Sequence, residues 1–120
     1  MECGVVFYTD RRGHCYVAEY LDGIQPKVKG KAVKWISKLK ELGPNLPRPY
    51  ADMVQSPIRE LRVVFGSEQH RFLYFFIGKT AVITHGFLKK DWEVPKNEIE
   101  LALRPMNDFD KQIEEGRITL

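Results

Sequence analysis

Three segments rich in β-branched and aromatic residues follow one another in the middle of the chain, and they limit its fold more than any other feature. Only "GSEQ" and "GK" separate them, and short links that begin with glycine are typical of turns between antiparallel strands. The run therefore predicts a three-stranded antiparallel meander. Its strands are "IRELRVVF" (58–65), "HRFLYFFI" (70–77) and "TAVITHGFL" (80–88).

A strand pattern and two helix patterns precede this meander. "VVFYT" (5–9) has strand composition, and a short helix is expected from about Cys15 to Leu21. A second helix is predicted from Pro26 to Leu42, because proline is tolerated at a helix start and Gly43-Pro44 ends the pattern. Its apolar positions recur at helical spacing: Val28, Ala32, Ile36 and Leu39.

The remaining segments complete an α+β layout. "PNLPRPY" (44–50) is expected to be an extended connector. After the meander, Pro95 begins another predicted helix, which Pro105 interrupts, and the polar residues from about 106 onward are expected to be a tail that is either loosely packed or holds another helical turn. The order predicts a small, mostly antiparallel sheet of about four strands, with the helices on one face and the other face partly open.

Length and composition limit the class of protein. The 120 residues suit a single domain over 1–120, and 43% apolar with 29% charged residues is typical of an ordered globular chain. No apolar segment approaches the ~20 residues of a transmembrane helix, and the first ten residues lack the organisation of a signal peptide. We therefore expect a cytoplasmic protein without membrane contact, in which Cys3 and Cys15 are reduced.

Positive charge is concentrated in the region of the meander. Residues 57–90 contain six Lys/Arg and two Asp/Glu, whereas residues 91–120 contain four and eight. The net charge of +3 is only mildly basic, so it allows a nucleic-acid target without requiring one.

Strand alternation predicts which of these cations share a face. In the first meander strand Arg62 points away from Leu61 and Val63, and in the second Arg71 points away from the aromatic residues 72, 74 and 76. The two arginines are therefore expected to be neighbours on the open face. Lys89 and Lys90 end the third strand beside the same surface.

Four cations on one face suit a phosphate backbone, because arginine binds phosphate bidentately and lysine supplies a mobile charge. A solvated surface is the alternative, and for each cation taken alone it is the commoner role. His85 is either a structural histidine or a group that titrates near neutrality. Glu60 is either a salt-bridge partner of Arg62 or a site residue, and Trp92 is expected to cover the sheet edge.

Several kinds of site have no counterpart in the sequence. It contains no glycine-rich phosphate loop, no CxxC pair and no nucleophile elbow, and its three histidines lack the spacing of zinc ligands. We therefore expect neither a metal nor a cofactor.

The ordered set of motifs resembles the HigB-like, phage-associated branch of the RelE/ParE toxin superfamily. "PIRELRVVF", "HRFLYFF" and "HGFLKK…P…EIELAL" are similar to its strand ending in E-L-R, its arginine before an aromatic strand, and its H-G-F-x-K-K motif followed by a proline and a helix. "FYTDRRGHCYVAEYL" and "KLKELGPNLPRPY" are similar to the opening elements of that branch. The resemblance covers roughly residues 4–104.

This resemblance implies a RelE-like fold and the toxin of a type II toxin–antitoxin pair. Such toxins are metal-independent endoribonucleases that cleave mRNA in the ribosomal A site, and a cognate antitoxin, for HigB usually a helix-turn-helix protein, neutralises them. The catalytic positions carried over are Arg62, Arg71, Lys89, Lys90 and His85. The predicted substrate-binding positions are Glu60, Arg59 and Trp92.

The implied reaction is attack of an RNA 2′-hydroxyl on the adjacent phosphate, which leaves a 2′,3′-cyclic phosphate. Arg62 and Arg71 suit stabilisation of the transition-state charge. The general base stays open between Lys89 or Lys90, whose pKa neighbouring cations lower, and His85. Tyr74 points to the core side by strand parity.

Two other functions stay open. A ParE-like toxin would act on gyrase with a related fold but without these basic residues. A relative that binds RNA or protein without cleaving is the second, because Asp91 and Glu93 place negative charge next to the two lysines.

Overall fold

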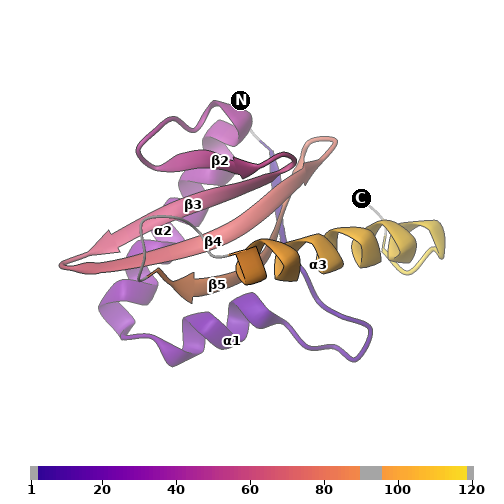
Figure 1. Cartoon of the computed structure of the whole chain (residues 1–120), viewed down its shortest axis with the longest axis horizontal. Helices are drawn as coiled ribbons and strands as arrows, with labels where there is room; N and C mark the ends of the chain where they lie inside the picture. Colours follow the sequence, from indigo (N-terminus) through magenta and orange to yellow (C-terminus); the bar gives the residue numbers. More distant parts are fainter. Residues whose placement is uncertain (1–2, 90–95, 119–120) are drawn as a thin grey trace.

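A five-stranded sheet forms the centre of the computed structural model, which describes residues 3–89 and 96–118. The strand order is β1-β5-β4-β3-β2, with β1 parallel to β5 and the other pairs antiparallel (Figure 1). The α+β class and the meander β3-β4-β5 are confirmed. The strands are β1 (Gly4–Phe7), β2 (Ala51–Gln55), β3 (Ile58–Phe65), β4 (Glu68–Ile77) and β5 (Thr80–Leu88).

The fifth strand, β2, is the element that the sequence patterns did not predict. It directly follows the proline-punctuated connector and lies at the sheet edge beside β3, where Asp52 is opposite Glu60. Five residues between prolines give only a weak strand pattern, and the backbone pairing with β3 supplies the missing stabilisation. This strand brings Asp52 next to the predicted arginine pair.

Two helices cover one face of the sheet. They are α1 (Tyr16–Gly23) and α2 (Pro26–Leu42), and a 3-10 turn at Gly43–Asn45 follows. Their buried side chains pack against the aromatic face of the meander, as predicted, and Phe72 and Tyr74 lie at its centre. The helix residues in this core include Val17, Leu21, Ala32 and Leu39.

A third helix, α3 (Lys96–Glu114), covers part of the opposite face, which corrects the prediction that all helices share one face. In Figure 1, α3 lies in front of the sheet and α2 behind it. Leu73 and Phe75 point to this side and pack against Ala102 and Phe109. Since apolar side chains line both faces of β4, burying only one face would leave a hydrophobic surface in water.

Helix α3 continues through Pro105, which was expected to interrupt it, and the segment from 106 is packed rather than loose. Its buried residues Ala102, Pro105, Phe109 and Gln112 recur at helical spacing. The proline ring therefore lies in the buried stripe, where burial offsets the hydrogen bond that the missing N–H would have made.

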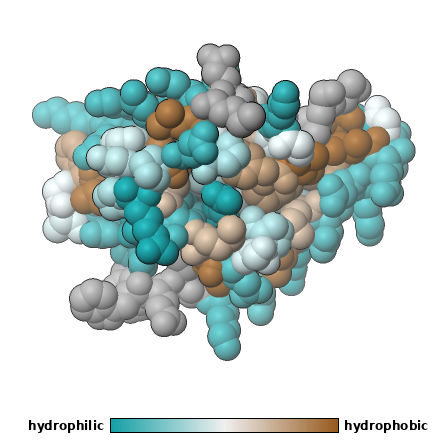
Figure 2. Space-filling view, turned by 90° about the horizontal axis from the view of Figure 1, so that it is seen from above, coloured by the Kyte–Doolittle hydropathy of each residue, from teal (hydrophilic) through white to brown (hydrophobic). Residues whose placement is uncertain are grey.

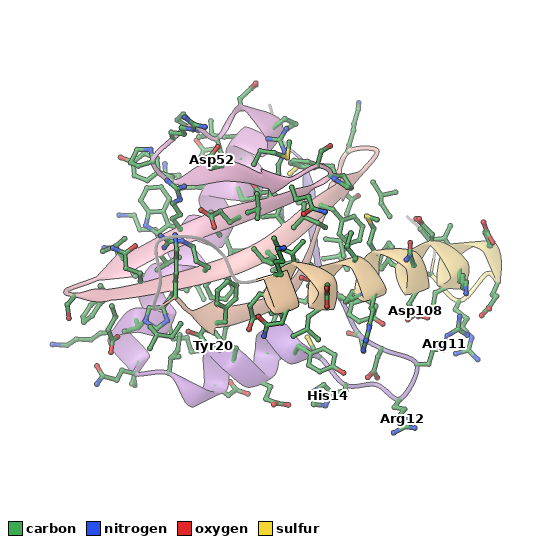
Figure 3. The ribbon with its side chains drawn as sticks, in the orientation of Figure 1. Arg11, Arg12, His14, Tyr20, Asp52 and Asp108 are labelled. Carbon is green, nitrogen blue, oxygen red and sulfur yellow. The ribbon has the colours of Figure 1, made fainter. Side chains whose placement is uncertain are left out.

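The far half of α3 is tied to the loop after β1. Arg11 donates from Nε to Asp108 at 2.8 Å and from Nη1 to Glu115 at 2.8 Å, and Figure 3 shows Arg11 beside Asp108. The Tyr8 hydroxyl donates to the same Asp108 carboxylate at 2.6 Å. These contacts hold α3 across the sheet well beyond its first turns.

The surface seen from above is mainly hydrophilic, with hydrophobic residues visible between the polar ones (Figure 2). Among the residues that the structure describes, no helix combines the length and the apolar character needed to cross a lipid bilayer.

Candidate functional site

Arg62 on β3 and Arg71 on β4 are direct cross-strand partners. Opposite residues of an antiparallel pair project from the same face, so their guanidinium groups lie side by side. The predicted proximity of the two arginines is therefore confirmed. Phe87 is in turn opposite Arg71, which extends this row of side chains onto β5.

Glu60 lies between the two arginines and is buried. Its Oε1 accepts a hydrogen bond from Arg62 Nε at 2.7 Å, and its Oε2 is 3.6 Å from Arg71 Nε. The second distance is too long for a hydrogen bond. Within the described residues, Glu60 Oε2 and Arg71 Nε have no hydrogen-bond partner although both are buried. Glu60 and Arg71 are therefore held together by their charges and not by a hydrogen bond.

Arg71 is the more buried arginine, with its side chain 5% exposed against 27% for Arg62. It donates from Nη2 to Gln69 Oε1 at 2.7 Å and from Nη1 to the His70 carbonyl at 3.2 Å. Burial lowers the pKa of Arg71, an effect that Glu60 opposes. An arginine side chain nevertheless stays protonated in a protein. Arg71 therefore supplies a permanent positive charge, which its hydrogen bonds hold in place.

The row of charges continues onto β2. Asp52 Oδ2 lies 3.3 Å from Arg62 Nη2, and its Oδ1 lies 3.0 Å from Arg48 Nε (Asp52 is labelled in Figure 3). Burial raises the pKa of Asp52, but the hydrogen bonds from Arg48 and the Met53 N–H outweigh it, so that pKa lies below its usual range. Cation and anion therefore alternate from Arg48 to Arg71, and the carboxylates partly neutralise the arginines.

Lys89 follows β5 and lies near this row. Its backbone N–H donates to the Gln69 carbonyl at 2.8 Å, which places it two pairs beyond Phe87 and Arg71, and its side chain is half-buried. Lys90 and Trp92, both predicted site residues, lie outside the described residues, as do Asp91 and Glu93.

His85 is on the same face but is engaged by other side chains. Its Nε2 is 2.8 Å from Glu98 Oε2 on α3, and its Nδ1 is 3.0 Å from Thr84 Oγ1. Burial lowers its pKa and outweighs the opposing effect of Glu98. His85 therefore links the sheet to the first turn of α3, and it must release one partner before it can accept a substrate proton.

Arg59 is not brought to the site. It is opposite Tyr74, on the other face of the sheet from Arg62, and its guanidinium carbon lies 5.5 Å from the centre of the Phe76 ring. Tyr74 itself is 1% exposed, and burial raises its pKa to about 12, which agrees with the prediction that it belongs to the core.

A cavity of about 690 Å³ adjoins the site beyond His85 and Phe87. It lies between α1, β5 and the first half of α3, and Tyr20 on α1 is labelled near it in Figure 3. The sequence patterns did not indicate it, because its walls come from segments that are distant in the sequence. Its other aromatic and aliphatic lining residues are Tyr8, Tyr16, Ile24 and Leu101.

Sequence reasoning also missed Asp52, Gln69 and Glu98 as neighbours of the predicted residues. Asp52 lies on the unpredicted strand β2, and Glu98 on the helix that covers the other face. Gln69 could have been found, because it is two residues from Arg71 and strand alternation places the two on one face.

Comparison with protein families gives one match that spans most of the chain. A family model described as "Phage derived protein Gp49-like (DUF891)" matches residues 19–107. This range contains all the alternating charges described above, from Arg48 to Arg71. A comparison with curated proteins finds no match.

Proposed function

Since the chain belongs to the phage-derived Gp49-like family, part of the RelE-like superfamily of toxin–antitoxin systems, we propose that it is the toxin of a type II pair. Within that superfamily we place it in the HigB-like branch. In this proposal it cleaves mRNA in the ribosomal A site, in the cytoplasm, and a cognate helix-turn-helix antitoxin neutralises it.

The pairing of Arg62 with Arg71 is the observation that supports this proposal most. Two guanidinium groups on one face, with the Arg62 side chain 27% exposed, suit the non-bridging oxygens of a phosphate. Glu60 favours the same arrangement, because its carboxylate reduces the repulsion between the arginines while no RNA is bound.

The proposed reaction needs only side chains. The 2′-oxygen of the RNA attacks the adjacent phosphorus, the bond to the 5′-oxygen breaks, and a 2′,3′-cyclic phosphate and a 5′-hydroxyl result. One proton leaves the 2′-hydroxyl for a base and another reaches the departing oxygen. Arg62 and Arg71 stabilise the charge that develops on the phosphate.

The proton-transfer groups in this proposal are Lys89, Lys90 and His85. Lys89 lies nearest to the arginine row through its pairing with Gln69. His85 can take part only when Glu98 or Thr84 gives way, so its first role is to position α3 beside the site.

The experiment that tests this proposal is controlled expression of the chain, with primer extension on a translated and an untranslated copy of one reporter mRNA. Cuts confined to the translated copy, together with growth arrest, are expected. Growth arrest with intact mRNA would favour a gyrase-directed toxin instead. Normal growth with intact mRNA would favour a relative that binds without cleaving.

A further inference from the structure

Arg71 is oriented by hydrogen bonds and not by the carboxylate nearest to it. Its Nε lies 3.6 Å from Glu60 Oε2, beyond hydrogen-bond range, and among the described residues neither atom has a hydrogen-bond partner. The attraction between two charges depends on their separation and not on the plane of the guanidinium group. The direction in which Arg71 points is therefore set by the hydrogen bonds of its other two nitrogens.

Those two nitrogens donate to the two residues that directly precede Arg71 in β4. Nη2 is 2.7 Å from the side-chain Oε1 of Gln69, and Nη1 is 3.2 Å from the carbonyl oxygen of His70. A guanidinium group only donates, so the Gln69 amide presents its oxygen. The bond to Gln69 has the length of a charge-assisted hydrogen bond, whereas the bond to His70 is at the long end of the usual range. Gln69 is thus the principal directional contact of Arg71.

Gln69 is an exposed residue, although the arginine that it contacts is buried. Strand alternation places the two side chains on one face of β4. The Gln69 carbonyl also accepts the backbone N–H of Lys89 at 2.8 Å, so this residue adjoins two cations of the candidate site. Substitution of an exposed polar side chain usually changes stability little. The contacts of Gln69 therefore favour a role at the site over a role in folding.

The gap between Glu60 and Arg71 is small enough for the pair to close. A shift of about 0.5 Å would bring Glu60 Oε2 and Arg71 Nε within hydrogen-bond range. The closed pair would satisfy two buried polar atoms, and the carboxylate would then neutralise more of the charge on Arg71. Since the guanidinium group is rigid and planar, a movement that closes the gap also displaces Nη2 from its place beside Gln69. The hydrogen bond to Gln69 therefore opposes closure.

We propose that Gln69 is a positioning residue, which holds the Arg71 guanidinium away from Glu60 and so keeps its charge directed at a bound phosphate. This inference rests on the proposed function, because that function supplies the phosphate. Glu60 then serves the two arginines unequally, with a hydrogen bond of 2.7 Å to Arg62 and a distance of 3.6 Å to Arg71. Gln69 does not touch the substrate in this arrangement and acts only through Arg71.

Two substitutions of Gln69 in the full-length chain test this role. Gln69→Leu removes the acceptor at nearly constant size, whereas Gln69→Glu keeps an acceptor oxygen on a side chain of the same length. Gln55→Leu is the matched control, because it makes the same chemical change at an exposed residue of β2. Urea unfolding of all three variants confirms that each one folds.

The first measurement does not depend on cleavage. Nitrogen-15 NMR follows the Nε–H signal of Arg71, which is assigned by its loss in Arg71→Lys. In Gln69→Leu we expect this signal to shift and its hydrogen to exchange with water about tenfold more slowly, because Nε then donates to Glu60. Gln69→Glu and Gln55→Leu should keep the wild-type signal. An unchanged signal in Gln69→Leu would overturn the inference.

The second measurement is the rate of cleavage on ribosomes that carry mRNA in the A site. We expect Gln69→Leu to lower kcat by about 10–100-fold with KM within about threefold, since a buried, misplaced cation affects the transition state more than binding. Gln69→Glu should restore most of the loss, and Gln55→Leu should cleave as wild type does. A Gln69→Leu variant with wild-type kcat, or with a changed KM alone, would contradict the role.

The two measurements separate this inference from the proposed function. If wild type cleaves mRNA and Gln69→Leu leaves both kcat and the Arg71 signal unchanged, only the inference fails. If wild type does not cleave mRNA, the proposed function fails, and the Arg71 signal still decides whether Gln69 holds this arginine away from Glu60.

Discussion

Arg62 and Arg71 face each other across the β3–β4 ladder, and one buried carboxylate, that of Glu60, lies 2.7 Å from the first and 3.6 Å from the second. The unequal distances give the two arginines different roles. Arg62 donates one hydrogen bond to Glu60 and is partly exposed, whereas Arg71 is buried and its Nε makes no hydrogen bond. A phosphate that enters the site can therefore reach Arg62 from solvent, whereas Arg71 contributes its charge from below the surface.

Glu60→Gln is expected to lower the free energy of unfolding by about 3 kcal/mol, because it leaves Arg71 as a buried charge without a carboxylate. Urea denaturation measures the change. Glu41→Gln is the control, since its carboxylate is 62% exposed and its removal should cost under about 0.5 kcal/mol. A Glu60 variant as stable as the control would show that the buried pair contributes nothing.

Arg62→Lys is expected to reduce mRNA cleavage by about 100-fold while the protein stays folded, because lysine keeps the charge but loses the planar donor set. Primer extension and growth on induction measure the effect. Arg59→Lys is a matched control three residues away on the opposite face, and it should remain toxic. The proposed site is wrong if both variants cleave equally well.

The stability of the protein is expected to decrease as the pH falls below 6.5. The pKa of His85 is lowered from its ordinary value of 6.5 in the folded state, so at acidic pH the unfolded chain binds the proton more readily. Protonation then favours unfolding, and the loss continues until the pH passes the folded-state pKa.

Urea midpoints measured from pH 7.5 to pH 5 follow this effect. His85→Gln should flatten the profile, because it removes the group whose pKa is lowered in the folded state. A wild-type protein that becomes more stable toward pH 5.5 would show that the ion pair with Glu98 outweighs the burial of His85.

Gly86→Ala is expected to cost about 1–3 kcal/mol of stability. A Cβ at this position would lie 2.7 Å from Tyr20 Cδ2 and 2.8 Å from Phe72 Cε1, so the ring contacts between α1 and the sheet would have to shift. Gly30→Ala on the exposed surface of α2 meets nothing within 4 Å and should instead stabilise the helix by up to about 1 kcal/mol. Thermal unfolding should show a lower melting temperature for Gly86→Ala and an equal or higher one for Gly30→Ala.

Period-two alternation predicted the faces of Arg62, Arg71 and Tyr74 correctly, because the side chains of a strand alternate whatever covers the sheet. The same rule does not show whether a face is covered. Leu73 and Phe75 share the face of Arg71, which was expected to be partly open, and Ala102 and Phe109 of α3 cover them.

The two remaining differences come from proline. Pro105 was expected to interrupt the helix, because proline usually destabilises a helix interior. Its side chain is buried in the structure, and that burial depends on tertiary packing, which the sequence pattern does not show. Strand β2 follows a proline-punctuated connector and depends on pairing with β3 rather than on its own composition. Asp52 and Glu98 could not be assigned to the site until these two elements were placed.

The parallel pairing of β1 with β5 has a consequence for the order in which the protein becomes active during its own synthesis. Gly4 pairs with Thr80, and β1 has no other neighbour in the sheet. The first strand to be translated therefore waits for the last one, and Lys89 arrives with that same strand. A chain that is still being synthesised therefore lacks both the closed sheet and this cation until β5 has emerged.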